Sequence, residues 1–508
     1  MVASESKWRR DALCVVGCLL LLSCGGEPSP LEPRVPTAPT TKSPAAHETT
    51  LPAAPGGPQA PDGVWRGVLA GNLRLALTLA REGDHYRGIL ESLDQGATMP
   101  VDRIAIEGDK LRFDIAAVSG SYEGKIDANR IDGTWTQNGE PQPLAFTRSQ
   151  RSQAAPSQGP IPKPIDVPVD IVVGHPPTVL RASDRAHFVY ELHITNFSDR
   201  ELLLQGIDVQ SRGRSLAHYG ALDLATMCQR PGVPDAVGTE RLRIGPGLRA
   251  IAFMWVTADD APSTLDHHVT FQLSGDSDEL AVSDVRTVVG SAKAPVIGAP
   301  LRGRWWAAAN GPSNTSHHRR ALIPVGGKAH IAQRFAIDWV KLGDDGETFT
   351  GDPTKNASYH AYGQEALAVA DGVVTDVRDG IAENVPGQKP RDPITLDNVA
   401  GNHVIVDLGG GAFAFWAHFQ PGSIRVKVGD RVKRGQVLGL VGNSGNSSEP
   451  HLHFHVMDGR SVLGSEGIPY AFDMFEVRAP TAKPDDKPMK PLVRRKQLPM
   501  NREAVAFP

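Results

Sequence analysis

The sequence has 508 residues, 40% of them hydrophobic and 22% charged, with a formal net charge of −4 at pH 7. This length exceeds one ordinary domain and predicts roughly three. The slightly negative charge supplies no basic field, which argues against nucleic acid as a partner. The 52 glycines and 41 prolines favour short strands, turns and linkers over long helices, so we expect an all-β protein.

The first 24 residues have the features of a secretion signal. Basic residues precede an apolar run at 12–22, which is too short to span a membrane and suits a signal-peptide core. The run ends in Leu21-Leu22-Ser23-Cys24, which resembles a bacterial lipobox, whose cysteine becomes a lipid anchor; an ordinary cleaved signal is the alternative. Gly25 does not resemble the acidic signal for inner-membrane retention. We therefore expect a chain anchored through Cys24 to the outer membrane and facing the periplasm.

Two regions without apolar periodicity separate the expected domains. Residues 25–63 are rich in Pro, Ala, Thr and Ser and cannot bury enough surface to offset ordering entropy, so they predict a disordered tether. Residues 149–168 are a second linker rich in Pro, Gln and Ser.

Residues 64–148 show short alternating segments separated by turn signals, which predicts a small antiparallel β-barrel. The expected strands are 73–80, 86–92, 103–107, 110–115, 120–126 and 130–137. Residues 169–297 have strand-like segments spaced as in a β-sandwich, at 187–194, 201–209, 249–257 and 266–273. An immunoglobulin-like spacer or interaction domain is the expected structure there.

Residues 298–478 form the third expected domain, and residues 479–508 are expected to be a flexible tail. Because the sequence indicates separate domain cores, we expect a fragment that starts near Gly298 to fold alone. In the third domain His451, His453 and His455 alternate along a predicted strand at 452–456, which we expect to pair with residues 437–441 across the loop 442–450. Side chains at i and i+2 share a face of a strand, so these imidazoles point the same way. Taken alone, the pattern also fits an exposed polar strand.

Neighbouring motifs favour a metal site over an exposed strand. Five segments occur in this order: Ala368-Val369-Ala370-Asp371-Gly372-Val373-Val374, Gly401-Asn402-His403-Val404-Ile405-Val406, Ala417-His418-Phe419, Gly429-Asp430-Arg431-Val432-Lys433-Arg434-Gly435-Gln436 and Pro450-His451-Leu452-His453-Phe454. Together they resemble the lysostaphin-type (LytM-domain) zinc endopeptidases of peptidoglycan. The resemblance implies a C-terminal domain built on an antiparallel lysostaphin-like β-sheet.

The resemblance also implies roles for single residues. His453 would be a ligand of Zn²⁺, and His418 and His451 would be the catalytic pair that moves protons and stabilises the oxyanion. A zinc ion with an open position makes water nucleophilic near neutral pH, which amide hydrolysis requires.

The first family motif, HxGxD, is altered in this chain. Asp338 occupies the position of the Asp ligand, but Arg334 replaces the histidine and Ala336 replaces the glycine. A guanidinium does not ligate a cation, so one ligand is missing from its usual place. We expect Arg334 to bind a substrate carboxylate or to pair with Asp338.

Histidines elsewhere in the domain are candidates for the missing ligand. His318 ranks first because it shortly precedes the Asp338 strand; His360 ranks second, and His330 is a further candidate. The alternative for each is an ordinary loop histidine.

The sequence thus predicts a lipid-anchored cell-wall metalloendopeptidase that cuts peptide cross-links of peptidoglycan. The competing hypothesis is a catalytically degenerate LytM-type regulator that binds a partner cell-wall hydrolase or a wall peptide.

Overall fold

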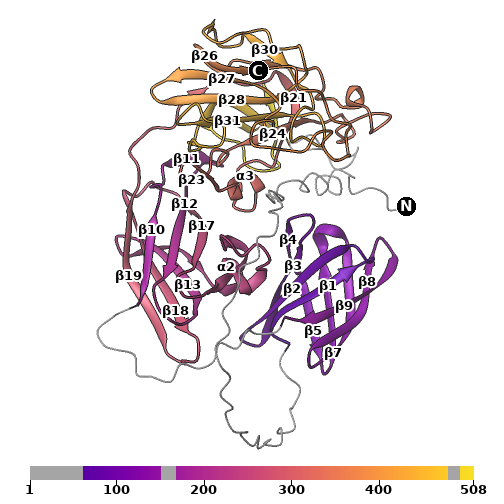
Figure 1. The fold of residues 1–508 in the computed structure, drawn as a ribbon, viewed down its shortest axis with the longest axis vertical. Helices are drawn as coiled ribbons and strands as arrows, with labels where there is room; N and C mark the ends of the chain where they lie inside the picture. The colour runs from indigo at the N-terminus through magenta and orange to yellow at the C-terminus, as the bar shows by residue number, and fades with distance from the viewer. Residues whose placement is uncertain (1–60, 150–166, 479–491) are drawn as a thin grey trace, which may run out of the picture.

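The computed structural model describes residues 61–149, 167–478 and 492–508. The expected signal peptide, the lipobox-like segment with Cys24, most of the expected tether and most of the expected linker lie outside these residues. Within the described part, helices are too short or too polar to serve as membrane spans. Three β-rich bodies follow one another along the chain (Figure 1), so the predicted all-β fold class is confirmed.

The first body, residues 61–149, is a nine-stranded antiparallel sheet in the order β4-β3-β2-β1-β9-β8-β7-β6-β5. Its alternating sequences explain the strands, since β6 buries every second side chain. The sheet curls into a half-barrel around Trp65 and Trp135, which are both buried. Its strands are β1 (Gly63–Leu69), β2 (Leu73–Glu82), β3 (His85–Ser92), β4 (Ala97–Pro100), β5 (Arg103–Glu107), β6 (Lys110–Ile115), β7 (Gly120–Asp127), β8 (Arg130–Gln137) and β9 (Glu140–Arg148).

The second body, called the sandwich domain here (residues 167–290), has two five-stranded sheets. One contains β10 (Val169–Val173), β11 (Val179–Ala182), β12 (Arg185–Asn196), β15 (Cys228–Gln229) and β17 (Arg249–Ala258). The other contains β13 (Leu202–Ser211), β14 (Arg214–Tyr219), β16 (Arg243–Ile244), β18 (Thr264–Leu273) and β19 (Glu279–Val288). The short helix α2 (Ala221–Met227) follows β14.

The third body, called the C-terminal domain here (residues 296–478 and 492–508), centres on an eleven-stranded sheet. Its middle strands are β21 (Gly303–Ala309), β24 (Ile337–Lys341), β31 (Leu452–Met457), β28 (Ala412–Phe419), β27 (Asn402–Gly409) and β26 (Gly372–Arg378), in that spatial order. The other strands of the sheet are β20 (Val296–Ile297), β29 (Arg431–Val432), β32 (Ala471–Arg478), β33 (Leu492–Gln497) and β34 (Ala504–Phe507).

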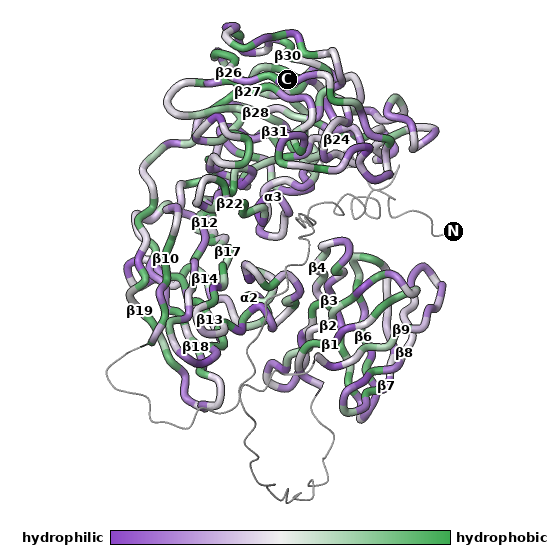
Figure 2. Tube along the Cα trace, in the orientation of Figure 1, coloured by the Kyte–Doolittle hydropathy of each residue, from purple (hydrophilic) through white to green (hydrophobic). Residues whose placement is uncertain are grey.

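Smaller elements surround this sheet. The helix α3 (His317–Arg320) lies between β21 and the small hairpin of β22 (Ile323–Val325) and β23 (Lys328–His330). A separate pair joins β25 (Glu365–Leu367) to β30 (Val437–Leu440). Hydrophobic segments run along the strands of all three bodies, and polar ones gather at the loops (Figure 2).

Two expectations about this domain are wrong. The segments 437–441 and 452–456 are strands, but they do not pair with each other: β30 pairs with β25, whereas β31 lies between β24 and β28. The expected tail contains β33 and β34, because its apolar residues Ala504, Val505 and Phe507 are buried against β21 and β32. Residues 479–491 lie outside the described part.

The sandwich and C-terminal domains share a continuous apolar core. Leu180 and Val189 of the sandwich domain pack with the main core of the C-terminal domain, and Ile251 and Phe253 pack with Ile331. The sequence predicted separate cores, but the absence of a long polar spacer between β19 and β20 allows direct packing.

Candidate metal centre

The centre of the site is the carboxylate of Asp338 on β24. In the sheet register Asp338 lies directly opposite His453 of β31, so both side chains share a face. His453 Nδ1 is 2.9 Å from Asp338 Oδ1. Because residues two apart on a strand share a face, His451 joins them, with its Nε2 3.4 Å from the same oxygen.

The helix α3 brings a further histidine to the other carboxylate oxygen. His318 Nε2 is 3.4 Å from Asp338 Oδ2, and its ring lies 4.9 Å from the ring of His453, centroid to centroid. The structure therefore gathers Asp338, His318, His451 and His453, all of them buried.

His418 reaches the site through an unusual backbone conformation. Its neighbour Ala417 is opposite His453 in the register, so regular alternation would turn His418 to the other face. Its φ of +68° is in the left-handed region, which costs a non-glycine residue about 1–3 kcal/mol. The turned ring lies 4.8 Å from that of His451, so all the histidines implied by the resemblance meet at one place.

Three of these imidazoles have their tautomers fixed by backbone carbonyls, which can only accept hydrogen bonds. Their Nδ1–H groups donate to the carbonyl oxygens of Asn310 (from His318, 3.0 Å), Ser444 (from His418, 2.7 Å) and Glu449 (from His451, 2.8 Å). Each neutral ring is then left with its lone pair on Nε2. For His318 and His451 this atom faces Asp338.

An imidazole lone pair and a carboxylate oxygen repel each other unless a proton or a cation lies between them. Imidazole nitrogens with one carboxylate are a donor set that suits Zn²⁺, and backbone acceptors on the far ring nitrogen are the usual way to orient such ligands. The residues present therefore fit a zinc ion.

Burial and the charges of neighbouring side chains also shift the pKa values of the site residues. Burial raises the pKa of Asp338, but the neighbouring histidines, His318 first, outweigh it and hold the pKa well below its ordinary value. Burial lowers the pKa of His418, and His451 lowers it further. Burial likewise lowers the pKa of His318 to about 4, which favours its neutral, ligating form.

His317 is a site residue that the sequence analysis did not single out. Its ring nitrogen, that of His318 and a carboxylate oxygen of Asp338 all lie within 4.8 Å of one another. The sequence signal for His317 is that it directly precedes His318. The four-residue helix α3 turns both side chains toward Asp338. His455 was noted only for its spacing; its Nδ1 lies 2.9 Å from His453 Nε2, behind the site.

The other candidate ligands lie elsewhere. His360 contacts Thr350, and His330 faces Glu466. Arg334 is buried and pairs with Glu191 of β12 and with Glu466, so the expected pairing with Asp338 is wrong and protein carboxylates occupy the guanidinium. Residues 332–335 form a turn before β24, and this turn directs Arg334 toward the sandwich domain.

The helix α3 is anchored in the sandwich domain. Arg319 is fully buried, pairs with Glu191 and donates to the carbonyl oxygen of Tyr190 at 2.8 Å. Arg320 donates to the carbonyl oxygens of Thr226 and Met227, both at 2.9 Å. Arg319 and Arg320 thus fix the position of His318, which supplies the extra imidazole.

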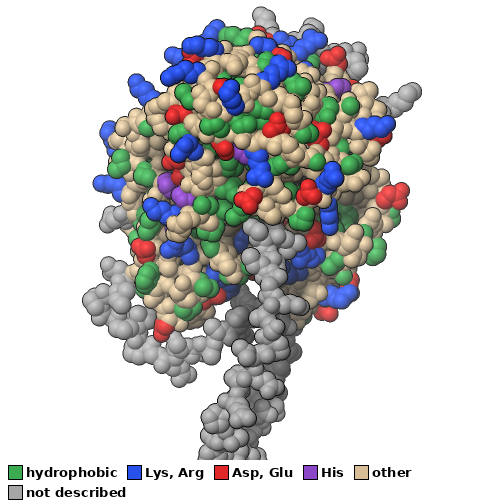
Figure 3. All heavy atoms as spheres, turned by 45° about the horizontal axis from the view of Figure 1, so that its top comes forward, with side chains coloured by type: hydrophobic (Ala, Val, Ile, Leu, Met, Phe, Trp, Pro, Cys, Tyr) green, Lys and Arg blue, Asp and Glu red, His purple; other side chains and the backbone are tan. Residues whose placement is uncertain are grey.

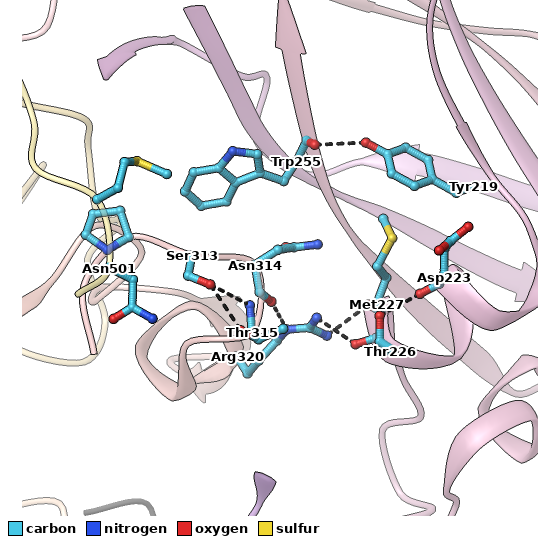
Figure 4. A pocket seen from close by; sticks show the side chains of 12 residues that line it. Tyr219, Asp223, Thr226, Met227, Trp255, Ser313, Asn314, Thr315, Arg320 and Asn501 are labelled. Atoms are coloured by element: carbon cyan, nitrogen blue, oxygen red, sulfur yellow. Dashed lines mark hydrogen bonds between the residues drawn. The ribbon is translucent and has the colours of Figure 1, made fainter. Parts of the chain in front are cut away.

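A hollow of about 550 Å³ lies beside this anchor, between Trp255 of the sandwich domain and residues 312–315 and 500–501. Figure 4 shows Arg320 reaching across it toward Thr226. The histidines near Asp338 do not line it. On the face shown in Figure 3, basic and acidic side chains are interspersed.

Comparisons with known proteins find relatives of the C-terminal domain. The model of Peptidase family M23 matches residues 357–463, which include His418, His451 and His453, whereas Asp338 and α3 precede the match. Peptidoglycan DD-endopeptidase ShyA of Vibrio cholerae is 41% identical over 64 residues, which are 12% of this chain and 14% of that protein. Glycyl-glycine endopeptidase ALE-1 of Staphylococcus capitis is 42% identical over 57 residues, 11% of this chain and 16% of that protein.

Among solved structures, the catalytic domain of the prophage-encoded M23 protein EnpA from Enterococcus faecalis is 22% identical. It covers 35% of this chain and 93% of that domain, with a TM-score of 0.20. The chain spans only a small part of the length of its curated relatives.

Proposed function

Residues 357–463 belong to peptidase family M23 and are of the LytM type, and from this premise we propose that the chain is a zinc metalloendopeptidase that hydrolyses the peptide cross-links of peptidoglycan. Asp338, His453 and His318 would hold the zinc ion, with His318 in place of the histidine that Arg334 replaces. The observation that supports this most is the set of Nδ1–H bonds to backbone carbonyls, which leave the Nε2 lone pairs of His318 and His451 directed at Asp338.

When bound, zinc supplies a Lewis acid that makes a water molecule nucleophilic near neutral pH and polarises the substrate carbonyl. His418 and His451 supply the proton chemistry. One imidazole Nε2 accepts a proton as water oxygen bonds to the carbonyl carbon, and that proton is delivered to the leaving amine nitrogen as the carbon–nitrogen bond breaks. The other imidazole stabilises the charge that develops on the carbonyl oxygen.

The acceptors behind the rings support this assignment. The carbonyl oxygen of Ser444 holds the His418 ring, and that of Glu449 holds the His451 ring. A ring that donates from Nδ1 and has its lone pair on Nε2 is ready to accept a proton there. Burial and a neighbouring histidine lower the pKa of His418, whereas the charge of Asp338 outweighs burial and raises the pKa of His451. Such divergence between neighbouring groups is typical of an acid–base pair.

The test combines metal analysis with activity. The purified chain should contain zinc and should release cross-link fragments from isolated peptidoglycan, and both should be lost on treatment with a chelator. A chain that contains no zinc and digests no peptidoglycan would instead support a LytM-type regulator that binds a partner hydrolase or a wall peptide. The observation that favours this second function is Arg334 itself, which occupies a ligand position of the family motif but pairs with Glu191 and Glu466.

A peptidoglycan substrate requires a location in the cell envelope. The lipobox-like segment ending at Cys24 supports attachment to a membrane, and the residue after it supports the outer membrane with the domains facing the periplasm. A tether at 25–63 would let the C-terminal domain reach the wall while the lipid stays in the bilayer.

A further inference from the structure

A second group of metal-ligand side chains lies where the sandwich domain meets the C-terminal domain. His175 follows β10, His330 ends β23, and Glu466 lies in the loop between β31 and β32. We propose that His175, His330 and Glu466 form a Zn²⁺ site that joins the two domains.

The spacing of the ligand atoms fits a tetrahedral ion. One ligand atom from each of the three residues lies within 4.8 Å of the others. Glu466 Oε1 is 3.2 Å from His175 Nε2 and 3.3 Å from His330 Nδ1. Two ligands bonded at about 2.0–2.1 Å to one tetrahedral zinc ion are about 3.3 Å apart. Both distances therefore correspond to edges of such a tetrahedron.

His330 supplies an independent observation. Its Nδ1 is buried and makes no hydrogen bond within the described residues, although it faces the carboxylate of Glu466. A buried nitrogen without a partner is costly. A cation between this nitrogen and Glu466 Oε1 would give the nitrogen a partner.

Glu466 is held in a ligating orientation by its surroundings. Its Oε2 accepts a hydrogen bond from Arg334 at 2.8 Å, and its Oε1 accepts one from the backbone N–H of Ile331 at 3.3 Å. Such bonds to a ligating carboxylate fix its position. Glu191, which also pairs with Arg334, offsets part of the local positive charge.

The three ligands leave one coordination position for water. The side chain of His175 is 49% exposed, whereas that of Glu466 is 8% exposed, so the ion can enter from the His175 side. The site is separate from the proposed catalytic centre, since it uses neither Asp338 nor any histidine near it. Its ligands come from both domains, so binding the ion favours the docked arrangement over a separated one.

Zinc stoichiometry of the full chain tests the proposal. The parent should bind two zinc ions after dialysis against metal-free buffer. Asp338→Asn removes the carboxylate ligand of the proposed catalytic centre, so this variant should bind one zinc ion. Adding His175→Ala to Asp338→Asn should leave none, whereas adding His218→Ala, an exposed sandwich-domain histidine that pairs with Asp208, should leave one.

Zinc should also raise the melting temperature of Asp338→Asn, and His175→Ala or Glu466→Gln should abolish this rise. His175 is an exposed loop residue, so its variant keeps the fold even if Glu466→Gln does not. The proposal is overturned if Asp338→Asn binds no zinc, or if its zinc content is the same with and without His175→Ala. The latter result would show that His175, His330 and Glu466 interact with one another without binding zinc. A parent with one zinc ion that depends on His175 and not on Asp338 would support this site and contradict the proposed function.

Discussion

His318 and Arg319 are consecutive residues of α3, yet their side chains enter different domains. His318 Nε2 lies 3.4 Å from Asp338 Oδ2, whereas Arg319 is buried in the sandwich domain beside Glu191 and the backbone of Tyr190. A displacement of the sandwich domain would therefore move an imidazole of the proposed zinc site. This domain is part of the framework of the centre, whereas the sequence had suggested a spacer or interaction domain.

Glu191→Gln should destabilise the chain and weaken zinc binding together. Glu191 is the shared partner of Arg319 and Arg334, and removing one member of a buried ion-pair network costs about 3–5 kcal/mol. Denaturant unfolding and zinc titration with a competing chelator provide the two measurements. Glu201→Gln, at a more exposed pair with Arg243, should cost less than about 1 kcal/mol. Equal zinc affinity in Glu191→Gln and the parent would contradict the coupling.

A fragment that starts near Gly298 should fold poorly and bind zinc weakly. The sequence suggested that it would fold alone, but without the sandwich domain Arg319 and Arg320 lose their carbonyl and carboxylate partners, and Ile331 loses its apolar contacts. A fragment that starts near residue 167 should recover both properties. Circular dichroism, solubility and zinc content compare the two, and equal behaviour would show that the interface is dispensable.

Variants at the centre should separate metal binding from turnover. His453→Ala and His318→Ala should lose both zinc and activity, because each removes a proposed ligand. His418→Ala should keep its zinc and lose about 10²–10⁴ in rate, the usual effect of losing an acid–base group. His360→Ala serves as the control, since this ring lies outside the site. If His318→Ala keeps the zinc content of the parent, His318 does not replace the ligand histidine whose position Arg334 occupies.

The domain junction should weaken in acid. Burial raises the pKa of Glu191, but Arg319 and Arg334 outweigh it, and the net effect lowers the pKa from 4.5 to about 2. A lowered pKa stabilises the folded chain above pH 4.5, and this contribution, on the order of 3 kcal/mol, is lost as the pH falls toward about 2. Unfolding free energies measured from pH 5 to 3 should fall less steeply in Glu191→Gln than in the parent. Parallel pH profiles would contradict this contribution.

Cys24→Ser should release the chain from the membrane fraction, because lipidation requires the thiol. Fractionation of cells that express the two forms measures this. If the unmodified chain is already soluble, the lipobox interpretation is wrong.

Much of the site followed from short-range patterns. Alternation placed His451 and His453 on one strand face, and the resemblance to the family motif HxGxD identified Asp338. His318 was chosen because it precedes that strand closely, and the structure brings it to Asp338. For His451 and His453, strand geometry turns sequence spacing directly into side-chain direction.

The remaining features depend on contacts between distant segments. Glu191 gives no sign in the sequence that it pairs with Arg319 and Arg334, more than a hundred positions later. The rotation of His418 into the site arises from its positive φ, which no composition rule predicts for histidine. The tail was misjudged because its prolines and basic residues mask a short apolar strand, β34.

The position of β34 also bears on the order in which the protein is made. Val505 pairs with Trp306, about 200 positions earlier, and such distant pairings form slowly. The strand that β34 supports, β21, also pairs Ala309 with Asp338. Translation is vectorial, so the support behind Asp338 is complete only after β34, which lies far downstream of β24, has left the ribosome.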